Sequence, residues 1–403
     1  MATTIEMVYI RQLHQVLLQQ LDSKFRRPLM DKIAWNERLV GIMGARGVGK
    51  TTLMLQRIQE KYGMGTNVLY TTLDSLSFNK GDLYQLAESC WQQGVEVLFL
   101  DEVHKFPTWS QELKMVYDFF PKLKVVFSGS SLLHIIQGNA DLSRRVVLYH
   151  LDGLSFREFL QVQTTKEFDV ITLPKLLKDH VAIAAAINKK IKPLALFKEY
   201  LRTGFYPYYL QGADTYGQKL MGTVVQMLEF DIPYLRGVEI RYVNKLKQLL
   251  HIIAQSVPFK PNVVQLADAV GLSRNAVLLY LHHLQDACII KLLYPGGAMY
   301  SKLKKPEKVY LWHPNHVYVL EEEKPDLGNI RETFFYNQVG AVHKISSARE
   351  GDFTVDKKYV FEIGGKGKTS DQVRHLKNAY LAIDDIEIGF ENRIPLWLCG
   401  FLY

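Results

Sequence analysis

The clearest chemical signal in the chain is a short glycine-rich segment that ends in a lysine and two threonines. Its residues are Gly44, Ala45, Arg46, Gly47, Val48, Gly49, Lys50, Thr51 and Thr52. The spacing G-x-x-x-x-G-K-T indicates a loop whose backbone N–H groups, with the positive end of the next helix, hold a phosphate. Lys50 is expected to reach the β- and γ-phosphates of a nucleotide, and the Thr51 hydroxyl to bind Mg²⁺. The alternative is a glycine-rich turn that contains a lysine by chance.

Two carboxylates, Asp101 and Glu102, follow the apolar run from Val95 to Leu100. Such a run is typical of a buried parallel strand, whose carboxyl end faces the ligand crevice of an α/β sheet. We expect Asp101 to hold Mg²⁺, and Glu102 to orient and deprotonate the attacking water. The alternative is a solvated acidic pair that caps the next helix.

Polar residues also follow the strand expected from Leu123 to Phe127. Ser128 is our first candidate for a side chain that senses the γ-phosphate, and Ser130 is the second. The alternative for both is an ordinary Ser/Gly turn. Arg144 and Arg145 come next, and an arginine there is suited to stabilise transition-state charge, on this nucleotide or on a neighbouring subunit's. The alternative is a pair of surface arginines.

Three further elements position these residues. A strand at 39–43 leads into the glycine-rich loop, and a second strand at 67–73 lies between the two motifs in sequence. This intervening strand favours the ATPase branch of P-loop proteins over kinases and small GTPases. Residues 8–34 are expected to form an amphipathic helix that runs into a basic turn, Lys24, Arg26, Arg27 and Pro28. We therefore predict an α/β P-loop NTPase core, with an AAA/ASCE-type parallel sheet, in residues 1–154.

These residues resemble a prokaryotic family that carries an AAA-type ATPase core followed by a C-terminal region of unknown function. The likeness lies in GARGVGKTTL (44–53), VLFLDEVHKFPTWSQELK (97–114), VVFSGSSLL (125–133) and LSRRVVLYHLDGLSFREFL (142–160). The resemblance implies that residues 44–51 form the Walker A motif, and that Asp101 and Glu102 form Walker B. The family's Gly-Arg step maps onto Arg144-Arg145, so Arg145 is the matching arginine, although the glycine is absent.

A helical lid is predicted for residues 155–240. Ser155 and Glu158 have the spacing of a capping box that begins a helix. The segment 202–207 interrupts the helical sequence that follows. The family has a similar Gly…Pro element in its lid, so the resemblance implies that Arg202 approaches the nucleotide. A plain helix break is the alternative.

A winged helix-turn-helix is predicted for residues 241–320. Two helices, at 263–270 and 274–284, flank a Gly-Leu-Ser turn, and strands at 288–293 and 309–312 follow. Residues suited to contact DNA are Arg274 and Asn275 for bases, and Lys302, Lys304, Lys305 and Lys308 for phosphates. The alternative is a winged helix used for packing, with solvated lysines.

Residues 321–403 resemble a restriction-endonuclease-like α/β core. The matching positions are Glu332 on a helix, and Asp352 and Glu362 on successive strands. In such cores the carboxylates bind Mg²⁺, and a lysine two positions after the Glu positions the water. That position is Gly364 here, and the nearest lysines are Lys366 and Lys368. The preferred interpretation is a degenerate nuclease fold, with Lys366 in its site, that serves binding or assembly. Independent solvated carboxylates are the alternative.

The composition excludes a largely disordered or collagen-like chain. The protein has 403 residues and a net charge of +8, and its hydrophobic and charged fractions, 48% and 22%, are typical of globular proteins. Residues 241–310 hold ten Lys or Arg against three Asp or Glu, so the basic excess belongs to the predicted winged helix. The three cysteines have no metal-ligand spacing, and no signal peptide or apolar run of about 20 residues is visible. We expect a soluble cytoplasmic protein.

The motifs together predict an ATP-binding, Mg²⁺-dependent ATPase that acts as a nucleotide-driven switch, coupled to duplex DNA or to a partner. That partner is another copy of the chain or an acidic protein, with no membrane involved. Two other functions stay open. One is a DNA-binding regulator that uses ATP as a ligand with negligible turnover. The other is a Mg²⁺-dependent nuclease.

Overall fold

The chain divides into two compact units, Met1–Gly153 and Leu154–Tyr403. The computed structural model describes residues 4–21, 25–74, 82–131, 142, 144–296, 304–321, 325–369 and 375–403. The division falls one residue before the boundary predicted between the ATPase core and the helical lid. The finer division of residues 155–403 into three domains stays a prediction. No helix in these described ranges is long and apolar enough to cross a membrane.

The first unit contains a five-stranded sheet in the order β2-β3-β4-β1-β5, with every neighbouring pair parallel. Its strands are β1 (Leu39–Gly44), β2 (Val68–Thr72), β3 (Val97–Asp101), β4 (Lys124–Ser130) and β5 (Val147–His150). Strands β1 and β3 are buried along their whole length, which explains why their sequences are continuous apolar runs. Since β3, β4 and β1 are adjacent and parallel, the segments that follow these three strands lie at the same edge of the sheet. This arrangement is consistent with the predicted P-loop NTPase fold.

The helices of the first unit are α1 (Thr4–Gln19), α2 (Leu29–Lys32), α3 (Lys50–Lys61), α4 (Asp82–Gln92), η1 (Val103–Lys105) and α5 (Trp109–Phe119). The helix expected within residues 8–34 is present as α1, which ends at Gln19, before the expected basic turn. Arg27 of that segment is buried, and its guanidinium donates to the carbonyls of Val48 and Asp152, at 3.2 and 2.9 Å. Pro28 also disfavours helical conformation in the residue before it.

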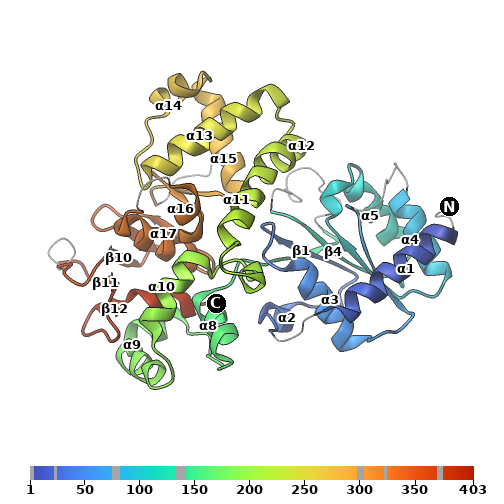
Figure 1. Ribbon diagram of the computed structural model, residues 1–403, viewed down its shortest axis with the longest axis horizontal. Coiled ribbons are helices and arrows are strands. Elements are labelled where there is room, and N and C mark those ends of the chain that lie inside the picture. The colour runs from blue at the N-terminus through green and yellow to red at the C-terminus, as the bar shows by residue number, and fades with distance from the viewer. Residues whose placement is uncertain are drawn as a thin grey trace. The chain divides into compact units, whose positions relative to one another are not determined.

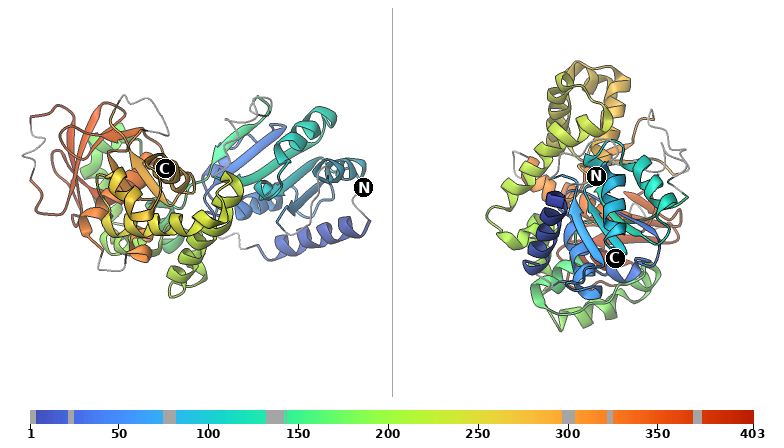
Figure 2. Two further views of the ribbon diagram at one scale, coloured as in Figure 1. Left: turned by 90° about the horizontal axis from the view of Figure 1, so that it is seen from above. Right: turned by 90° about the vertical axis from the view of Figure 1, so that its right-hand side faces the viewer.

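Helix α1 packs along β2, an edge strand of the sheet (Figure 2). The backbone N–H of Tyr70 on β2 donates to Nδ1 of His14 on α1, at 3.1 Å. Burial lowers the pKa of His14 and favours the neutral ring that accepts this bond. Helices α1, α4 and α5 contribute apolar side chains to one hydrophobic core with the strands.

The second unit is mainly helical in its first half (Figure 1). Its helices are α8 (Phe156–Thr164), α9 (Leu173–Asn188), α10 (Pro193–Thr203), η2 (Pro207–Gln211), α11 (Tyr216–Gln226), η3 (Met227–Asp231), α12 (Ile232–Arg236), η4 (Ile240–Tyr242), α13 (Val243–Ser256), α14 (Val263–Val270), α15 (Arg274–Asp286), α16 (Pro314–Leu320), α17 (Leu327–Gly340) and η5 (Leu396–Phe401). The predicted capping box at Ser155 and Glu158 is confirmed, with both of its hydrogen bonds present.

The predicted pair of helices is present as α14 and α15. Gly271 ends α14 with a left-handed φ of 64°, and Ser273 caps α15 through the Ala276 N–H. The antiparallel strands β6 (Ile290–Leu293) and β7 (Lys308–Leu311) follow. The fold expected of these elements, a winged helix, stays a prediction.

The C-terminal part of the second unit contains a five-stranded sheet in the order β12-β11-β10-β9-β8. The strands are β8 (Ile345–Ser347), β9 (Phe353–Val355), β10 (Tyr359–Gly364), β11 (Ala379–Ile383) and β12 (Arg393–Pro395). Strands β8, β9 and β10 pair antiparallel, whereas β10, β11 and β12 pair parallel. Helix α17 packs against β10 and brings Glu332 to this sheet.

A buried amide, that of Asn315 on α16, connects α16 to the end of α10 in the interior of the second unit. Its Nδ2 donates to the carbonyls of Tyr200 and Leu201 at the end of α10, at 3.1 and 2.8 Å. Its Oδ1 accepts from the backbone N–H of Phe205, at 3.0 Å. One side chain therefore hydrogen-bonds the carbonyls at the end of α10 and the next free N–H, at the helix break predicted at 202–207.

Two histidines that flank Asn315 make the second unit sensitive to acid. Burial lowers the pKa of His313, and burial lowers the pKa of His316 to about 3. Between about pH 7 and pH 5 the unfolded chain binds protons that the folded chain excludes, so stability falls as the pH falls through about 6.5. We expect the free energy of unfolding to fall by about 2 kcal/mol per histidine over this range.

Chemical denaturation of wild type and His316→Gln at several pH values, followed by near-UV circular dichroism, measures this loss. The variant should lose less stability on acidification, because one proton uptake is removed. The exposed His251 supplies a matched control, and His251→Gln should keep the wild-type dependence. An unchanged pH dependence in His316→Gln would contradict the burial argument.

Candidate functional site

The glycine-rich loop joins β1 to α3, as its spacing predicted. Gly47 and Gly49 have φ angles of 84° and 97°, in the left-handed region that favours glycine. A Cβ added to Gly44 would lie 2.3 Å from the carbonyl oxygen of Leu151, so this position also excludes a side chain. The backbone thus forms a tight loop at the N-terminus of α3, where free N–H groups attract an anion.

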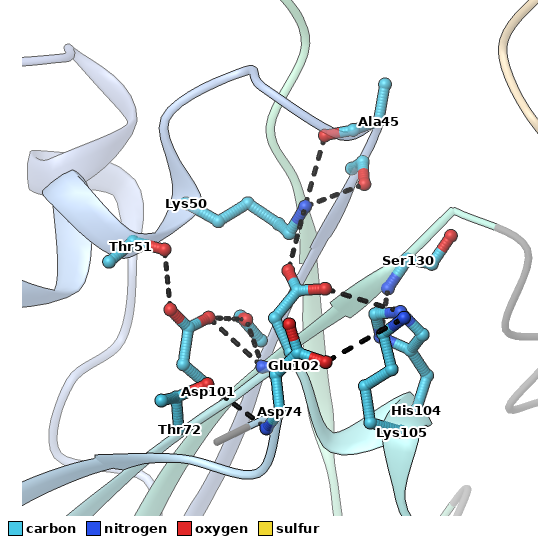
Figure 3. A network of polar contacts seen from close by, with 12 residues as sticks. Ala45, Lys50, Thr51, Thr72, Asp74, Asp101, Glu102, His104, Lys105 and Ser130 are labelled. Carbon is cyan, nitrogen blue, oxygen red and sulfur yellow. Dashed lines mark hydrogen bonds and ion pairs between the residues drawn. The ribbon is translucent and has the colours of Figure 1, made fainter. Parts of the chain in front are cut away.

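Lys50, at the start of α3, is almost fully buried against this loop. Its Nζ donates to the carbonyl oxygens of Gly44 and Ala45, at 3.1 Å each, and lies 3.8 Å from Oε1 of Glu102 (Figure 3). The ammonium group therefore stands between the phosphate-binding loop and the acidic pair. The structure confirms the proximity on which the sequence argument depended.

Asp101, at the end of β3, joins the elements of the site. Its side chain is 2% exposed and accepts from the Thr51 hydroxyl at 2.5 Å and from the Tyr70 hydroxyl at 2.8 Å. The Ser128 hydroxyl donates to its other oxygen. Burial, with the charge of Asp101 beside it, raises the pKa of Tyr70 and keeps this hydroxyl a donor. Tyr70 was not identified from the sequence, because it lies within an apolar strand.

Glu102 has a left-handed backbone with a φ of 56°, an unfavourable conformation for a residue with a side chain. Its N–H donates to the Ser128 Oγ at 3.0 Å, which fixes the conformation. One carboxylate oxygen faces Lys50, and Oε2 lies 3.3 Å from Nε2 of His104. The strained backbone thus directs the carboxylate into the space beside the loop.

His104, in the short helix η1, was not identified from the sequence. Its side chain is 2% exposed, and its Nδ1 accepts from the backbone N–H of Ser130, at 3.3 Å. Burial and the charge of Lys50 lower the pKa of His104 to about 3, so the ring is neutral. Since Nδ1 accepts a hydrogen bond, we assign the ring proton to Nε2, which faces Glu102. The only signal for this residue was its place two positions after the predicted base.

Arg145 does not join this cluster. Its guanidinium pairs with Asp118 at the end of α5, at 3.0 Å, and lies over the Tyr117 ring. Arg38, directly before β1, lies over the same ring. Arg145 is therefore at the amino ends of the strands, whereas Lys50 and the acidic pair are at their carboxyl ends. The expectation that Arg145 acts on its own chain's nucleotide is therefore wrong.

The remaining basic candidates lie in the second unit. Arg274 and Asn275, at the start of α15, and Lys304 and Lys305, before β7, are all exposed. Lys302 lies outside the described residues. Arg202 is exposed on α10, and its guanidinium lies over the Tyr318 ring.

Glu332 and Asp352 share one ion-pair partner in the second unit, whereas Glu362 has another. Lys308 pairs with both Glu332 and Asp352, so it is not a free phosphate contact as the sequence suggested. Lys368, and not Lys366, pairs with Glu362, while Lys366 is exposed. Burial, then the charge of Asp352, raises the pKa of Glu332.

Residues 36–160 match a family model described as an AAA domain, and residues 194–314 match a domain of unknown function (DUF8612). An uncharacterized protein of Methanocaldococcus jannaschii is 23% identical over 321 residues, which are 73% of this chain and 67% of that protein.

Solved structures with partial similarity include AMPPCP-bound DnaA from Aquifex aeolicus and PCH-2 from C. elegans. The first has a TM-score of 0.25 and 14% identity, and the match covers 69% of this chain and 88% of that chain. The second has a TM-score of 0.24 and 15% identity, and the match covers 67% and 66%. The AAA domain match, the parallel sheet and the phosphate-binding loop together support an AAA-type ATPase domain in residues 36–160.

Proposed function

We propose that the protein binds ATP with Mg²⁺ in the first unit and hydrolyses it, and that the nucleotide state acts as a switch on DNA or partner binding. The observation that carries the proposal is the convergence of Lys50, Thr51, Asp101 and Glu102 at one edge of the sheet. Lys50 supplies a positive charge at the loop, and Glu102 supplies a carboxylate beside it that can act as a base.

The donor set at this edge fits Mg²⁺. Thr51 Oγ1 and Asp101 Oδ2 are 2.5 Å apart, so a hydroxyl and a carboxylate are already adjacent. Hard oxygen donors of this kind, with phosphate oxygens and water, are the usual Mg²⁺ ligands. Thr51 and Asp101 would hold the ion, which supplies charge neutralisation at the phosphate oxygens when bound.

Glu102 is the proposed general base. It accepts a proton from water as the water oxygen attacks the γ-phosphorus, and the bond between that phosphorus and the β–γ bridging oxygen breaks. Ser128 holds the backbone of Glu102, and neutral His104, whose Nδ1 accepts from the Ser130 N–H on β4, places its Nε2 3.3 Å from the Glu102 carboxylate. His104 is therefore a positioning residue that acts through Glu102.

The same contacts suggest how the nucleotide state is sensed. Lys50 pairs with Glu102 and with the loop carbonyls. A γ-phosphate competes for this ammonium and so releases Glu102 from it. Since the Glu102 N–H donates to Ser128 and the Glu102 carboxylate lies beside His104, which accepts from Ser130, the end of β4 responds to this change.

Substitutions of Lys50 and Glu102 should separate binding from turnover. Lys50→Ala should abolish nucleotide binding, because the loop loses its ammonium group. Glu102→Gln should bind ATP normally but hydrolyse it at least about 100-fold more slowly. Fluorescent-nucleotide titration and phosphate release measure the two effects. The exposed Glu96→Gln change is the control, and undiminished hydrolysis by Glu102→Gln would refute its role as base.

His104→Ala should lower kcat by about 10- to 100-fold with little change in KM, because the carboxylate of Glu102 loses its orientation. His104→Gln should recover part of the rate, since an amide N–H replaces Nε2–H. With a pKa of about 3, His104 adds no step to the rate profile at neutral pH. The exposed His150→Ala change is the control. A rate step near pH 6.5 that disappears in the His104 variants would show instead that this histidine titrates during turnover.

A second candidate function is DNA binding by the predicted winged helix. Exposed Arg274 and Asn275 at the helix start, with Lys304 and Lys305 before β7, favour it. The logarithm of the affinity for duplex DNA should fall steeply with the logarithm of salt concentration. Reversing both lysines to Glu should reduce that slope by about 2.

Fluorescence anisotropy over a salt series tests this, with ATPase rates measured with and without duplex DNA. Lys175→Glu with Lys178→Glu, on exposed positions of α9, makes the same charge change and should leave the slope unaltered. DNA binding without measurable ATP turnover would favour the regulator that uses ATP only as a ligand. No binding at low salt would remove both the coupling to DNA and the regulator.

A further inference from the structure

The buried guanidinium of Arg27 connects two parts of the first unit that are distant in sequence. Its Nη1 donates to the carbonyl oxygen of Val48 in the phosphate-binding loop, at 3.2 Å. Its Nη2 donates to the carbonyl oxygens of Asp152 and Gly153, at 2.9 and 3.2 Å. Arg27 is 7% exposed, so these bonds replace water that the charged group has lost. One cation therefore joins the loop to the last residues of the first unit.

The main chain that carries Arg27 is anchored to α3, the helix that follows the loop. Gln56 Nε2 donates to the Phe25 carbonyl at 2.8 Å, and Arg26 Nε donates to Glu60 at the same distance. Gln56 and Glu60 both lie on α3. Because this main chain is held, a displacement of the loop carbonyl changes the other hydrogen bonds of the guanidinium.

The Val48 carbonyl responds to a bound phosphate because it shares a peptide group with the Gly49 N–H. A trans peptide group is planar, and its carbonyl and N–H point in opposite directions. Gly49 is the N-cap of α3, and the N–H groups at such a helix start bind anions. A phosphate that turns the Gly49 N–H toward itself also turns the Val48 carbonyl, which is bonded to Arg27.

The segment at the end of the first unit lies against the same loop. The Leu151 N–H donates to the Met43 carbonyl at 2.8 Å, directly before the loop begins. The Leu151 carbonyl approaches Gly44 so closely that a Cβ there would be 2.3 Å from its oxygen. With the two carbonyls held by Arg27, the backbone of three consecutive residues, 151–153, is therefore fixed to the phosphate-binding loop.

The next peptide group extends this connection into the second unit. The Gly153 carbonyl accepts from Arg27, and the N–H of the same peptide group, that of Leu154, donates to the Phe205 carbonyl at 2.7 Å. The Leu154 carbonyl in turn accepts from the Tyr200 hydroxyl, also at 2.7 Å. Leu154 is the first residue of the second unit. A rotation of this one peptide group therefore acts on Arg27 and on the end of α10 together.

We propose that Arg27 is a positioning residue that carries the nucleotide state of the loop to the second unit. This rests on the nucleotide binding proposed for the first unit. Two planar peptide groups, 48–49 and 153–154, each offer a carbonyl to Arg27 and an N–H to another partner, the phosphate in the first and Phe205 in the second. Arginine suits this position because its rigid guanidinium donates from two terminal nitrogens at once, whereas lysine is a point donor.

Hydrogen exchange of the full chain, with and without AMPPNP and Mg²⁺, measures this coupling at the Leu154 amide. In wild type the bound analogue should slow exchange there by about 5-fold or more, the lower end of ordinary coupling between sites. Arg27→Lys keeps the charge but loses the second donor nitrogen, so it should still bind AMPPNP while the Leu154 amide changes by less than about 2-fold. Arg26→Lys, the same change at the exposed neighbour, is the control and should respond like wild type.

Nucleotide affinity gives a second readout, because coupling between sites is reciprocal. Tyr200→Phe removes the hydroxyl that donates to the Leu154 carbonyl. It should weaken binding of a fluorescent ATP analogue by about 5-fold in wild type, but by less than about 2-fold in the Arg27→Lys background. Tyr209→Phe is the matched control, since both tyrosine rings contact Phe159, and it should leave the affinity unchanged.

Equal slowing of the Leu154 amide in wild type and Arg27→Lys overturns the proposal, as does an equal effect of Tyr200→Phe in both backgrounds. AMPPNP binding with no change at Leu154 in wild type overturns the coupling and leaves the proposed ATPase standing. Absence of AMPPNP binding to wild type overturns both. If near-UV circular dichroism shows that Arg27→Lys is unfolded, Tyr200→Phe alone decides, and an unchanged nucleotide affinity in that variant overturns the proposal.

Discussion

The first unit depends on one buried charge, the carboxylate of Asp101. A carboxylate removed from water is stable only where hydrogen-bond donors surround it. Donors from α3, β2 and β4 meet this need through Thr51, Tyr70 and Ser128. Each donor fixes the element that carries it, so the requirement of a single group sets the relative positions of the loop, the acidic pair and the end of β4. Catalytic geometry and local stability therefore have the same origin here.

The order of the strands also fixes the position of Glu102. Because β4 lies next to β3, Ser128 reaches both Asp101 and the backbone of Glu102, while Ser130 reaches His104. The unfavourable φ of Glu102 is held by these bonds. A strained residue supported by its neighbours is typical of a functional site, where strain improves the orientation of a reacting group.

The sequence was sufficient to predict the parallel sheet and the phosphate-binding loop, because buried strands and glycine-lysine spacing are local signals. It also placed Glu332 on a helix and Glu362 on a strand, as in α17 and β10, whereas Asp352, expected on a strand, precedes β9. It failed for Tyr70 and His104, whose roles arise only from packing across strands. The edge at which Arg145 lies could have been predicted, because a residue directly before a parallel strand lies at the amino end of that strand, away from the phosphate-binding loop. The basic turn after the N-terminal helix was expected, whereas the burial of Arg27 is a tertiary effect that no local pattern shows.

Lys368 reaches Glu362 by passing over Gly364, since a Cβ at position 364 would lie 2.6 Å from Lys368 Cβ, and this has a consequence for how related domains are recognised. A side chain can be delivered to a fixed point in space from several places along the backbone, provided that the intervening residues turn and leave room. Glycine at position 364 leaves the room that this route needs. A search for one fixed spacing between an acidic residue and a lysine would therefore miss the pairing of Glu362 with Lys368, whereas a search for a glycine followed four residues later by a lysine would find it.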